Sequence, residues 1–171
     1  MNDFSQIKKL IYKTCLNFVS QKESNVLETI TSNKKDLLSE TKSSSGDKHE
    51  TGRAMLQLEM EKASQQLLVV NEMKETLQKL TIETSTGNCK MGSLIKTTKG
   101  TYFLAVSVRK ITVEGEDYFV VSTKSPIGKQ LLGKKIGEVF HHPKGRNLFG
   151  VMVVDLSVPS PKGILCVPYG C

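Results

Sequence analysis

Residues 56–80 read LQLEMEKASQQLLVVNEMKETLQKL, and this stretch decides the fold of the first half of the chain. Apolar side chains recur there at seven-residue intervals, and a second set fills the alternate positions: Leu56, Ala63, Val70 and Leu77, with Met60 and Leu67 between them. This pattern is typical of an α-helix that packs along its length against another helix. Lys74 interrupts the alternate set, and we expect Met73 and Leu80 to cover that gap.

A less regular apolar seam precedes it. Six residues fall near one helical face: Ile11, Cys15, Phe18, Val26, Ile30 and Leu37. Lys22 and Asn33 interrupt this face, and a short polar cluster, SSSGDKHET, separates the two seams. We therefore predict an antiparallel α-helical coiled-coil hairpin over residues 1–84, with its tip at about 43–51 and arms of roughly 50 Å. The alternative is a globular bundle of three or four helices, with a break inside one of the arms.

The composition changes after Glu83, where residues 84–88, TSTGN, form a turn or linker. β-branched and aromatic residues then dominate, as in strands. We expect strands at five places: Ser93–Thr98, Thr101–Val108, Tyr118–Thr123, around Glu138–His141 and Leu148–Leu156. Residues 99–100 and 114–117 are predicted to form turns between them.

A short helical turn is predicted at Ile127–Leu132. Ser125 stands at its capping position, Pro126 occupies the first helical position, and Gly133 ends it. The predicted fold class is therefore α+β: the hairpin is followed by a small antiparallel-sheet domain over residues 85–156. The last residues, 157–171, hold three of the five prolines and receive no fold assignment.

Charge is distributed unevenly along the 171 residues, which carry 24 Lys plus Arg and 17 Asp plus Glu, a formal net charge of +7. The first 84 residues are balanced, so the basic excess belongs to the second half, and this suggests two units with different roles. No apolar run approaches the ~20 residues of a transmembrane helix, and the N-terminus lacks a signal-peptide pattern. We expect a soluble, cytoplasmic protein without membrane contact.

The four cysteines and several nucleotide- or metal-like patterns carry no catalytic prediction. No two of the cysteines have C-x-x-C spacing, so free thiols are expected: Cys15, Cys89, Cys166 and Cys171. Residues 128–135, GKQLLGKK, match G-x-x-x-x-G-K but place Lys where a phosphate-binding loop needs Ser or Thr. His141 and His142 are adjacent, so on a strand they point to opposite faces and chelate a metal poorly. A condensing enzyme using Cys89 with these histidines would need a chain about twice as long.

Two acids at the predicted tip are the strongest candidates for chemistry. Asp47 and Glu50 are three residues apart at the start of the second helix, so their carboxylates can share one face. Acids at a helix N-terminus also complement the helix dipole, and this structural explanation needs no function. A pair of carboxylates at an exposed tip is, however, also suited to a hard cation such as Mg²⁺, with water and phosphate completing its shell.

The sequence resembles the Gre family of bacterial transcript cleavage factors at two separate places. Residues 46–51, GDKHET, resemble the G-D-x-x-E-N element that joins the two coiled-coil helices in that family. Residues 125–138, SPIGKQLLGKKIGE, resemble the S-P-I-x-x-x-L-[IL]-G-K-x-x-G-[DE] stretch of its FKBP-like C-terminal domain. The order and separation of the two motifs agree with the family, and the resemblance covers roughly residues 5–140.

The resemblance implies a function carried out with a partner. In the family the coiled coil enters the secondary channel of bacterial RNA polymerase, and the C-terminal domain docks at its entrance. By motif, Asp47 and Glu50 would help to hold a Mg²⁺ ion of the polymerase, so that the 3′ end of a backtracked nascent RNA is hydrolysed. Ser125, Pro126 and Ile127 would lie near the docking surface. The resemblance thus implies a monomeric activator of the polymerase rather than an enzyme in its own right.

Departures from the family pattern keep other functions open. Thr51-Gly52-Arg53 follows the tip Glu where family members commonly have Asn, and Lys124 precedes the Ser-Pro turn where some carry an acid. One alternative is therefore a Gre-like regulator or inhibitor that occupies the channel without promoting cleavage. Another is a peptidyl-prolyl isomerase, although fold alone does not carry activity and the chain has no Trp for a proline pocket.

Overall fold

A computed structural model of the protein describes residues 4–40, 47–82, 88–98, 100–135, 137–141 and 148–150. The chain divides into two compact units, Ile11–Leu80 and a second unit made of Met1–Leu10 with Thr81–Cys171. The predicted domain boundary at residues 84–85 and the predicted tail at 157–171 lie outside the described residues.

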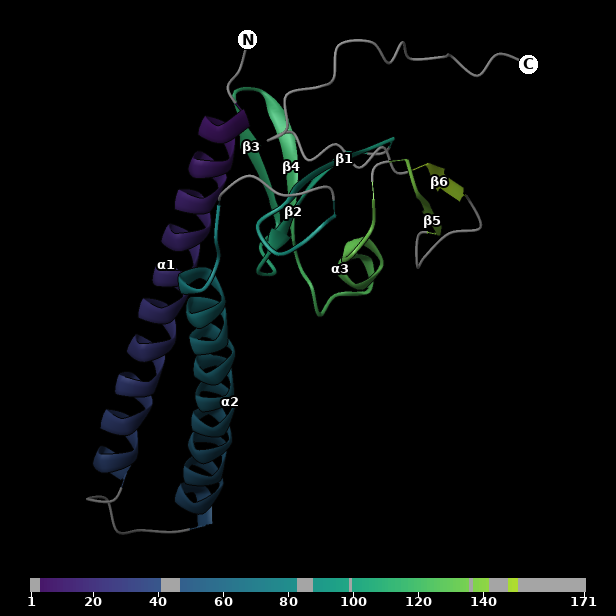
Figure 1. Cartoon of the computed structure of the whole chain (residues 1–171). Helices are drawn as coiled ribbons and strands as arrows, with labels where there is room; N and C mark the ends of the chain where they lie inside the picture. Colours follow the sequence, from purple (N-terminus) through teal and green to yellow (C-terminus); the bar gives the residue numbers. More distant parts are fainter. Residues whose placement is uncertain are drawn as a thin grey trace. The chain divides into compact units, whose positions relative to one another are not determined.

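Two long helices make up the hairpin, α1 (Phe4–Glu40) and α2 (Asp47–Gln78), and they lie side by side (Figure 1). The Tyr12 hydroxyl donates a hydrogen bond to the Leu77 carbonyl at 3.1 Å, and the Lys74 ammonium contacts both carboxylate oxygens of Glu23 at 2.8 Å. These contacts join the first part and the middle of α1 to the last turns of α2. The predicted helical hairpin is confirmed, and neither helix contains the break that the bundle alternative requires. Residues 43–46 of the predicted tip lie outside the described residues, whereas residues 47–51 are already helical.

The buried face of the hairpin follows the predicted heptads only in part, because five predicted seam residues are half-buried rather than buried: Ile30, Leu37, Leu56, Met60 and Leu67. On α2, Ala63, Val70 and Leu77 are buried, and Met73, with Leu80 just after the helix, covers the gap that Lys74 leaves. On α1 the buried residues include Ile11, Cys15, Val19 and Val26. The prediction that Phe18 lies in the seam is wrong, because Phe18 is 37 % exposed and its neighbour Val19 is buried in its place. Val19 lies seven residues before the buried Val26 and so occupies the same heptad position, whereas Phe18 lies eight residues before it.

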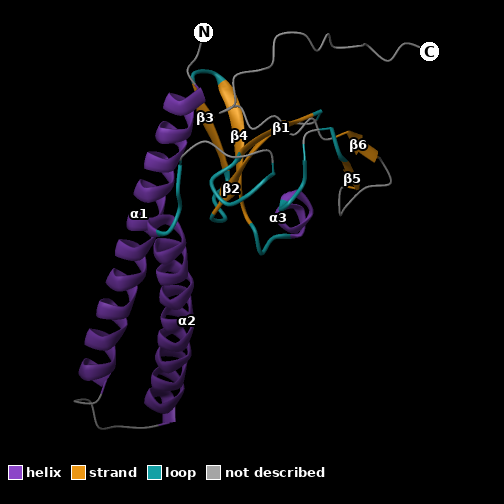
Figure 2. Ribbon diagram, viewed as in Figure 1, coloured by secondary structure: helices purple, strands orange, loops and turns teal. Residues whose placement is uncertain are grey.

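A four-stranded sheet forms the centre of the second unit (Figure 2). Its strands are β1 (Leu94–Thr97), β2 (Gly100–Ala105), β3 (Lys110–Val113) and β4 (Glu116–Ser122), in the spatial order β1-β2-β4-β3. β1 and β2 pair antiparallel with Thr97 opposite Gly100, and β3 and β4 pair antiparallel with Val113 opposite Glu116. Glu114 and Gly115 form the connecting turn with φ values of 53° and 84°, as a two-residue hairpin turn requires.

The prediction of a purely antiparallel sheet is wrong for the central pair. β2 and β4 run parallel, with Thr101 opposite Tyr118 and Ala105 opposite Ser122, so the sheet is mixed. The cause is β3, which the sequence analysis did not predict. After β2 the chain crosses to the outer edge, forms β3 there, and returns through the tight turn as β4 between β3 and β2. The α+β class itself is confirmed.

Residues from the sheet and the segment after it share one apolar core. Cys89, Ile95, Leu104 and Leu131 are buried together, and Tyr102, Val121 and Ile127 pack against them. Leu131 comes from α3 (Pro126–Leu131), which is the predicted helical turn. Backbone hydrogen bonds from Cys89 to the Lys134 carbonyl and from Gly133 to the Cys89 carbonyl fix the segment after α3 to residues before the sheet.

Two short strands complete the described elements, β5 (Val139–His141) and β6 (Leu148–Gly150), which pair antiparallel with Val139 opposite Gly150. Strands were predicted at both places, and residues 151–156 of the second lie outside the described part. Neither long helix carries an apolar window able to cross a bilayer, as far as the described chain extends.

Candidate functional site

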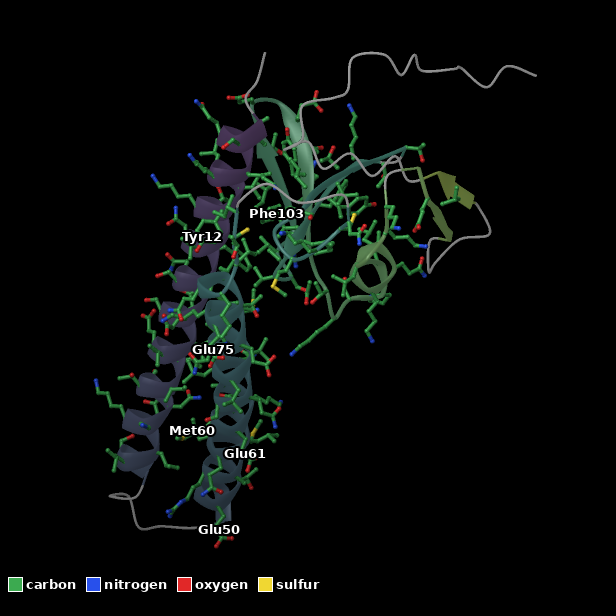
Figure 3. The ribbon with its side chains drawn as sticks, in the orientation of Figure 1. Tyr12, Glu50, Met60, Glu61, Glu75 and Phe103 are labelled. Atoms are coloured by element: carbon green, nitrogen blue, oxygen red, sulfur yellow. The ribbon has the colours of Figure 1, made fainter. Side chains whose placement is uncertain are left out.

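The tip of the hairpin is built by the first turn of α2. The helix begins at Asp47, and Glu50 follows three residues later in the same turn. Residues three apart on a helix are neighbours, with about 5–6 Å between their Cβ atoms. Figure 3 shows Glu50 at the end of α2 and Tyr12 in the opposite half of the hairpin. Glu50 is exposed, and the position of the Asp47 side chain lies outside what the structure describes.

Two carboxylates suit only part of a magnesium shell. Mg²⁺ prefers six oxygen ligands and is usually bound by one or two carboxylates, with water and phosphate oxygens completing the octahedron. Across the described residues no three His, Cys, Asp or Glu side chains gather in a way that could hold a metal ion. Asp47 and Glu50 could therefore supply at most two of the six oxygen ligands, so this pair alone does not complete a magnesium site.

The second predicted site, the Ser-Pro turn, is held by the Ser125 side chain. The Ser125 hydroxyl donates to the Ser122 carbonyl at 2.6 Å and accepts from the Gly128 amide at 3.1 Å, so it caps α3. The Ser125 amide also donates to the same Ser122 carbonyl at 2.9 Å. The capping prediction is confirmed, and the hydroxyl is engaged within the turn rather than presented to a partner.

Two residues essential to this turn were missed from the sequence, Ser122 and Gly128. A Cβ atom at Gly128 would overlap the Ser122 carbonyl oxygen and would lie 2.9 Å from the Ser125 hydroxyl oxygen. Only glycine therefore permits this close approach of α3 to the end of β4. The sequence signal for Gly128 was its place in the S-P-I-G stretch, but the contact that requires it depends on the tertiary structure.

The three predicted docking residues differ in what they present to solvent. Pro126 is exposed, Ser125 is half-buried, and Ile127 is half-buried against the apolar core of the sheet. Leu132 directly follows α3 and is 48 % exposed, although the sequence analysis did not single it out. The exposed apolar surface of this turn is thus made by Pro126 and Leu132, while Ile127 anchors the turn from inside.

Two exposed ion pairs neutralise acids of the second unit. Lys110 donates to Asp117 at 2.8 Å and the Thr112 hydroxyl donates to the same carboxylate at 2.7 Å, and these bonds hold the pKa of Asp117 below its usual value. The Lys134 ammonium lies 3.2 Å from Glu138, and this hydrogen bond lowers the pKa of Glu138. With their acids paired, these lysines add little to the basic excess, which rests on the remaining cations.

A groove of about 490 Å³ on the hairpin coincides with neither predicted site. Residues of both helices line it: Lys22, Lys62, Gln65, Gln66 and Val69. It contains no carboxylate and therefore adds no ligand to the acidic pair at the tip.

The sequence matches no protein-family profile and no curated protein sequence. Among solved structures it is similar to the transcription factor Gfh1, at 18 % identity and a TM-score of 0.31, over 83 % of this chain and 91 % of that one. It is also similar to GreA factor homolog 1 of Thermus thermophilus, at 18 % identity and a TM-score of 0.30, over 83 % and 92 % of the two chains. At this identity and these TM-scores, the similarity assigns no function to the chain.

Proposed function

We propose that the protein is a Gre-like transcription elongation factor that promotes cleavage of backtracked RNA by RNA polymerase. One observation carries the proposal: an acidic pair stands in the first turn of α2, at the end of a helix of 32 residues, about 48 Å long. A hairpin of this length has no need of two acids at its end for its own packing. It is well suited to deliver them into a site too narrow for a globular domain.

At such a site the residues of this chain would position rather than perform the reaction. Asp47 and Glu50 would offer carboxylate oxygens on one helical face, oriented by α2 and held there by the seam of the hairpin. When bound between them and the partner's ligands, Mg²⁺ supplies activation of a water and neutralisation of phosphate charge. Because two carboxylates are an incomplete shell, the isolated protein is expected to hold the ion weakly and to cleave no RNA.

The second unit would provide the docking contact with the polymerase. The Ser-Pro turn presents Pro126 and Leu132 on a rigid base, because Ser125 and Gly128 lock α3 against β4. The basic excess of this half of the chain favours an acidic surface on the partner, with an attraction that weakens as salt rises. Prolyl isomerase activity has no support from any described side chain.

The test is RNA cleavage in stalled, backtracked elongation complexes. Wild type is compared with Asp47→Asn and Glu50→Gln, and Glu61→Gln serves as the matched control because Glu61 is also an exposed acid of α2. We expect short RNA products with wild type and the control, and a loss of about 10²-fold or more in rate with either tip variant. Identical products from all four proteins would show that Asp47 and Glu50 have no role in the cleavage. Binding with no RNA shortening by wild type would instead identify a channel-occupying regulator.

A further inference from the structure

The seam of the hairpin can be divided into layers, each made of one residue from α1 and one from α2, and one of these layers contains a buried polar residue. The Tyr12–Leu77 hydrogen bond fixes the register of the two helices. Because both helices rise equally per residue, steps of seven along each bring successive pairs to the same level. Counted in this way from Tyr12 and Leu77, we infer three further layers: Val19 with Val70, Val26 with Ala63, and Asn33 with Leu56. The first three layers join buried apolar residues or a satisfied tyrosine, whereas the fourth contains a buried amide.

Asn33 is 7 % exposed, and its Nδ2 atom has no hydrogen-bond partner. A buried amide that has left water without a new acceptor destabilises the structure that buries it. In helix pairs, a polar residue at a seam position is known to lower stability while it specifies the pairing. The Asn33 layer is therefore the weakest of the four.

The arms beyond the Val26–Ala63 layer, residues 27–40 and 47–62, have little core of their own, and we call them the distal arms. Of their described side chains only Asn33 is buried. The apolar ones are half-buried or exposed: Ile30, Leu37, Leu56 and Met60, and Leu27, Leu38, Met55 and Leu58. Both inter-helix polar contacts named above, Tyr12–Leu77 and Glu23–Lys74, belong to the part nearer the other end. Stability thus falls along the hairpin towards the tip.

Loss of the distal packing would also unwind the start of α2. Isolated helices shorter than about 12–15 residues are marginal in water, and the distal part of α2, residues 47–62, is only slightly longer, so without its packing it depends on its own helix propensity. Gly52 stands in its second turn and lowers its helix propensity further. Since the i, i+3 spacing of Asp47 and Glu50 exists only while this turn is helical, opening of the distal arms separates the two carboxylates.

From this we propose that the distal arms open as a separate unit controlled by Asn33, and that the acidic pair is assembled when a partner holds the arms closed. The assembly of the acidic pair by a partner rests on the proposed function, whereas the opening of the distal arms does not. The two carboxylates would then share one helical face while a partner encloses the arms, and would be separated in free solution. This dependence on the partner would restrict the metal-binding arrangement to the place where the remaining ligands are available.

Amide hydrogen exchange, followed by mass spectrometry, tests the opening in the full-length protein. In wild type we expect at least about tenfold lower protection in peptides from the distal arms than in those from 11–26 and 63–80. Asn33→Leu should raise distal protection about tenfold and leave the other peptides within twofold, because it removes the unpaired amide from the weak layer only. Ser32→Leu is the matched control, since Ser32 is exposed and receives the same added side chain. Uniform protection in wild type, or an equal rise in all peptides of Asn33→Leu, would overturn the proposal.

The same measurement with core RNA polymerase tests the role of the partner. Binding should raise protection in the distal arms more than in the rest of the hairpin. A complex that forms without this rise would overturn the assembly of the tip by the partner. Failure of wild type to bind the polymerase would reject the proposed function and the partner's role, while the exchange gradient of the free protein would still support or refute the opening itself.

Discussion

Replacement of Gly128 by alanine should destabilise the Ser-Pro turn more than the addition of one methyl group usually does. The added Cβ would overlap the Ser122 carbonyl oxygen and would lie 2.8 Å from the Ser122 carbonyl carbon and 2.9 Å from the Ser125 hydroxyl oxygen. Two of these atoms are backbone and cannot rotate away. Relief therefore requires α3 to move away from β4, which breaks the hydrogen bond from the Ser125 hydroxyl to the Ser122 carbonyl. The Ser125 hydroxyl must also move away from the added atom and give up its bond from the Gly128 amide.

The expected magnitude follows from these two losses. Overpacking against a fixed backbone costs about 1–3 kcal/mol, and loss of a helix N-cap costs about 1 kcal/mol. We expect Gly128→Ala to lower the free energy of unfolding of this unit by about 3 kcal/mol. Gly133→Ala is the control: Gly133 has a φ of 81° but open space around the added atom, so only backbone strain of about 1 kcal/mol applies.

Urea denaturation followed by tyrosine fluorescence measures the difference, because Tyr102 and Tyr118 lie in the sheet that packs with α3. A fall in midpoint for Gly128→Ala about two to three times that of Gly133→Ala is expected. If Gly128→Ala is tolerated as well as Gly133→Ala, the tight approach of α3 to β4 is wrong.

Three further predictions concern the hairpin. Leu77→Ala should lower the free energy of unfolding by about 2–5 kcal/mol because Leu77 is fully buried. Leu68→Ala is the control and should change it by less than about 0.5 kcal/mol, because Leu68 is exposed. Urea denaturation of both variants measures the difference, and equal effects would contradict the burial of Leu77. A double-mutant cycle with Glu23→Gln and Lys74→Met should give a coupling of about 0.5–1 kcal/mol that shrinks in high salt, since both side chains remain partly exposed; a larger, salt-independent value would contradict this. Burial raises the pKa of the Cys15 thiol from its ordinary 9.0 to about 11. The folded state therefore binds more protons than the unfolded state between these values, so this contribution is complete below about pH 9 and is lost as the pH rises towards about 11. The difference in unfolding free energy between wild type and Cys15→Ala should fall by about 2 kcal/mol over that range, and a difference independent of pH would contradict the burial of the thiol.

Much of the hairpin could be predicted from sequence because a heptad seam reports directly on which face is buried. Ala63, Val70 and Leu77 were found in this way, and Met73 and Leu80 cover Lys74 as expected. The burial of Val19 in place of the predicted Phe18 shows the limit of heptad patterns. Both residues are apolar and adjacent, and only the continuous path of the seam along α1 decides between them.

The sheet was less predictable because pairing joins residues far apart in the chain. The alternation of exposed Lys110 and Thr112 with buried Ile111 and Val113 is a valid strand signal, but four residues are a short one. Nothing local in the sequence indicates that the strand after the turn inserts beside β2 and makes the sheet mixed.

The candidate sites divide in the same way. The cap at Ser125 and the i, i+3 placement of Asp47 and Glu50 follow from local helix chemistry, and the backbone agrees with both. The need for glycine at position 128 and the burial of Asn33 arise only from tertiary contacts. Asn33 is visible in the sequence as an interruption of the seam, but its orphaned amide is not.

The most direct measurement of the central claim is the rate of RNA shortening in a backtracked elongation complex saturated with protein. Saturation separates the chemistry at the tip from binding, because each variant then occupies every complex. We predict that the double variant Asp47→Asn/Glu50→Gln binds like wild type and is slower by about 10²-fold or more. Equal rates for the double variant and wild type at equal occupancy would contradict the assignment of these two carboxylates.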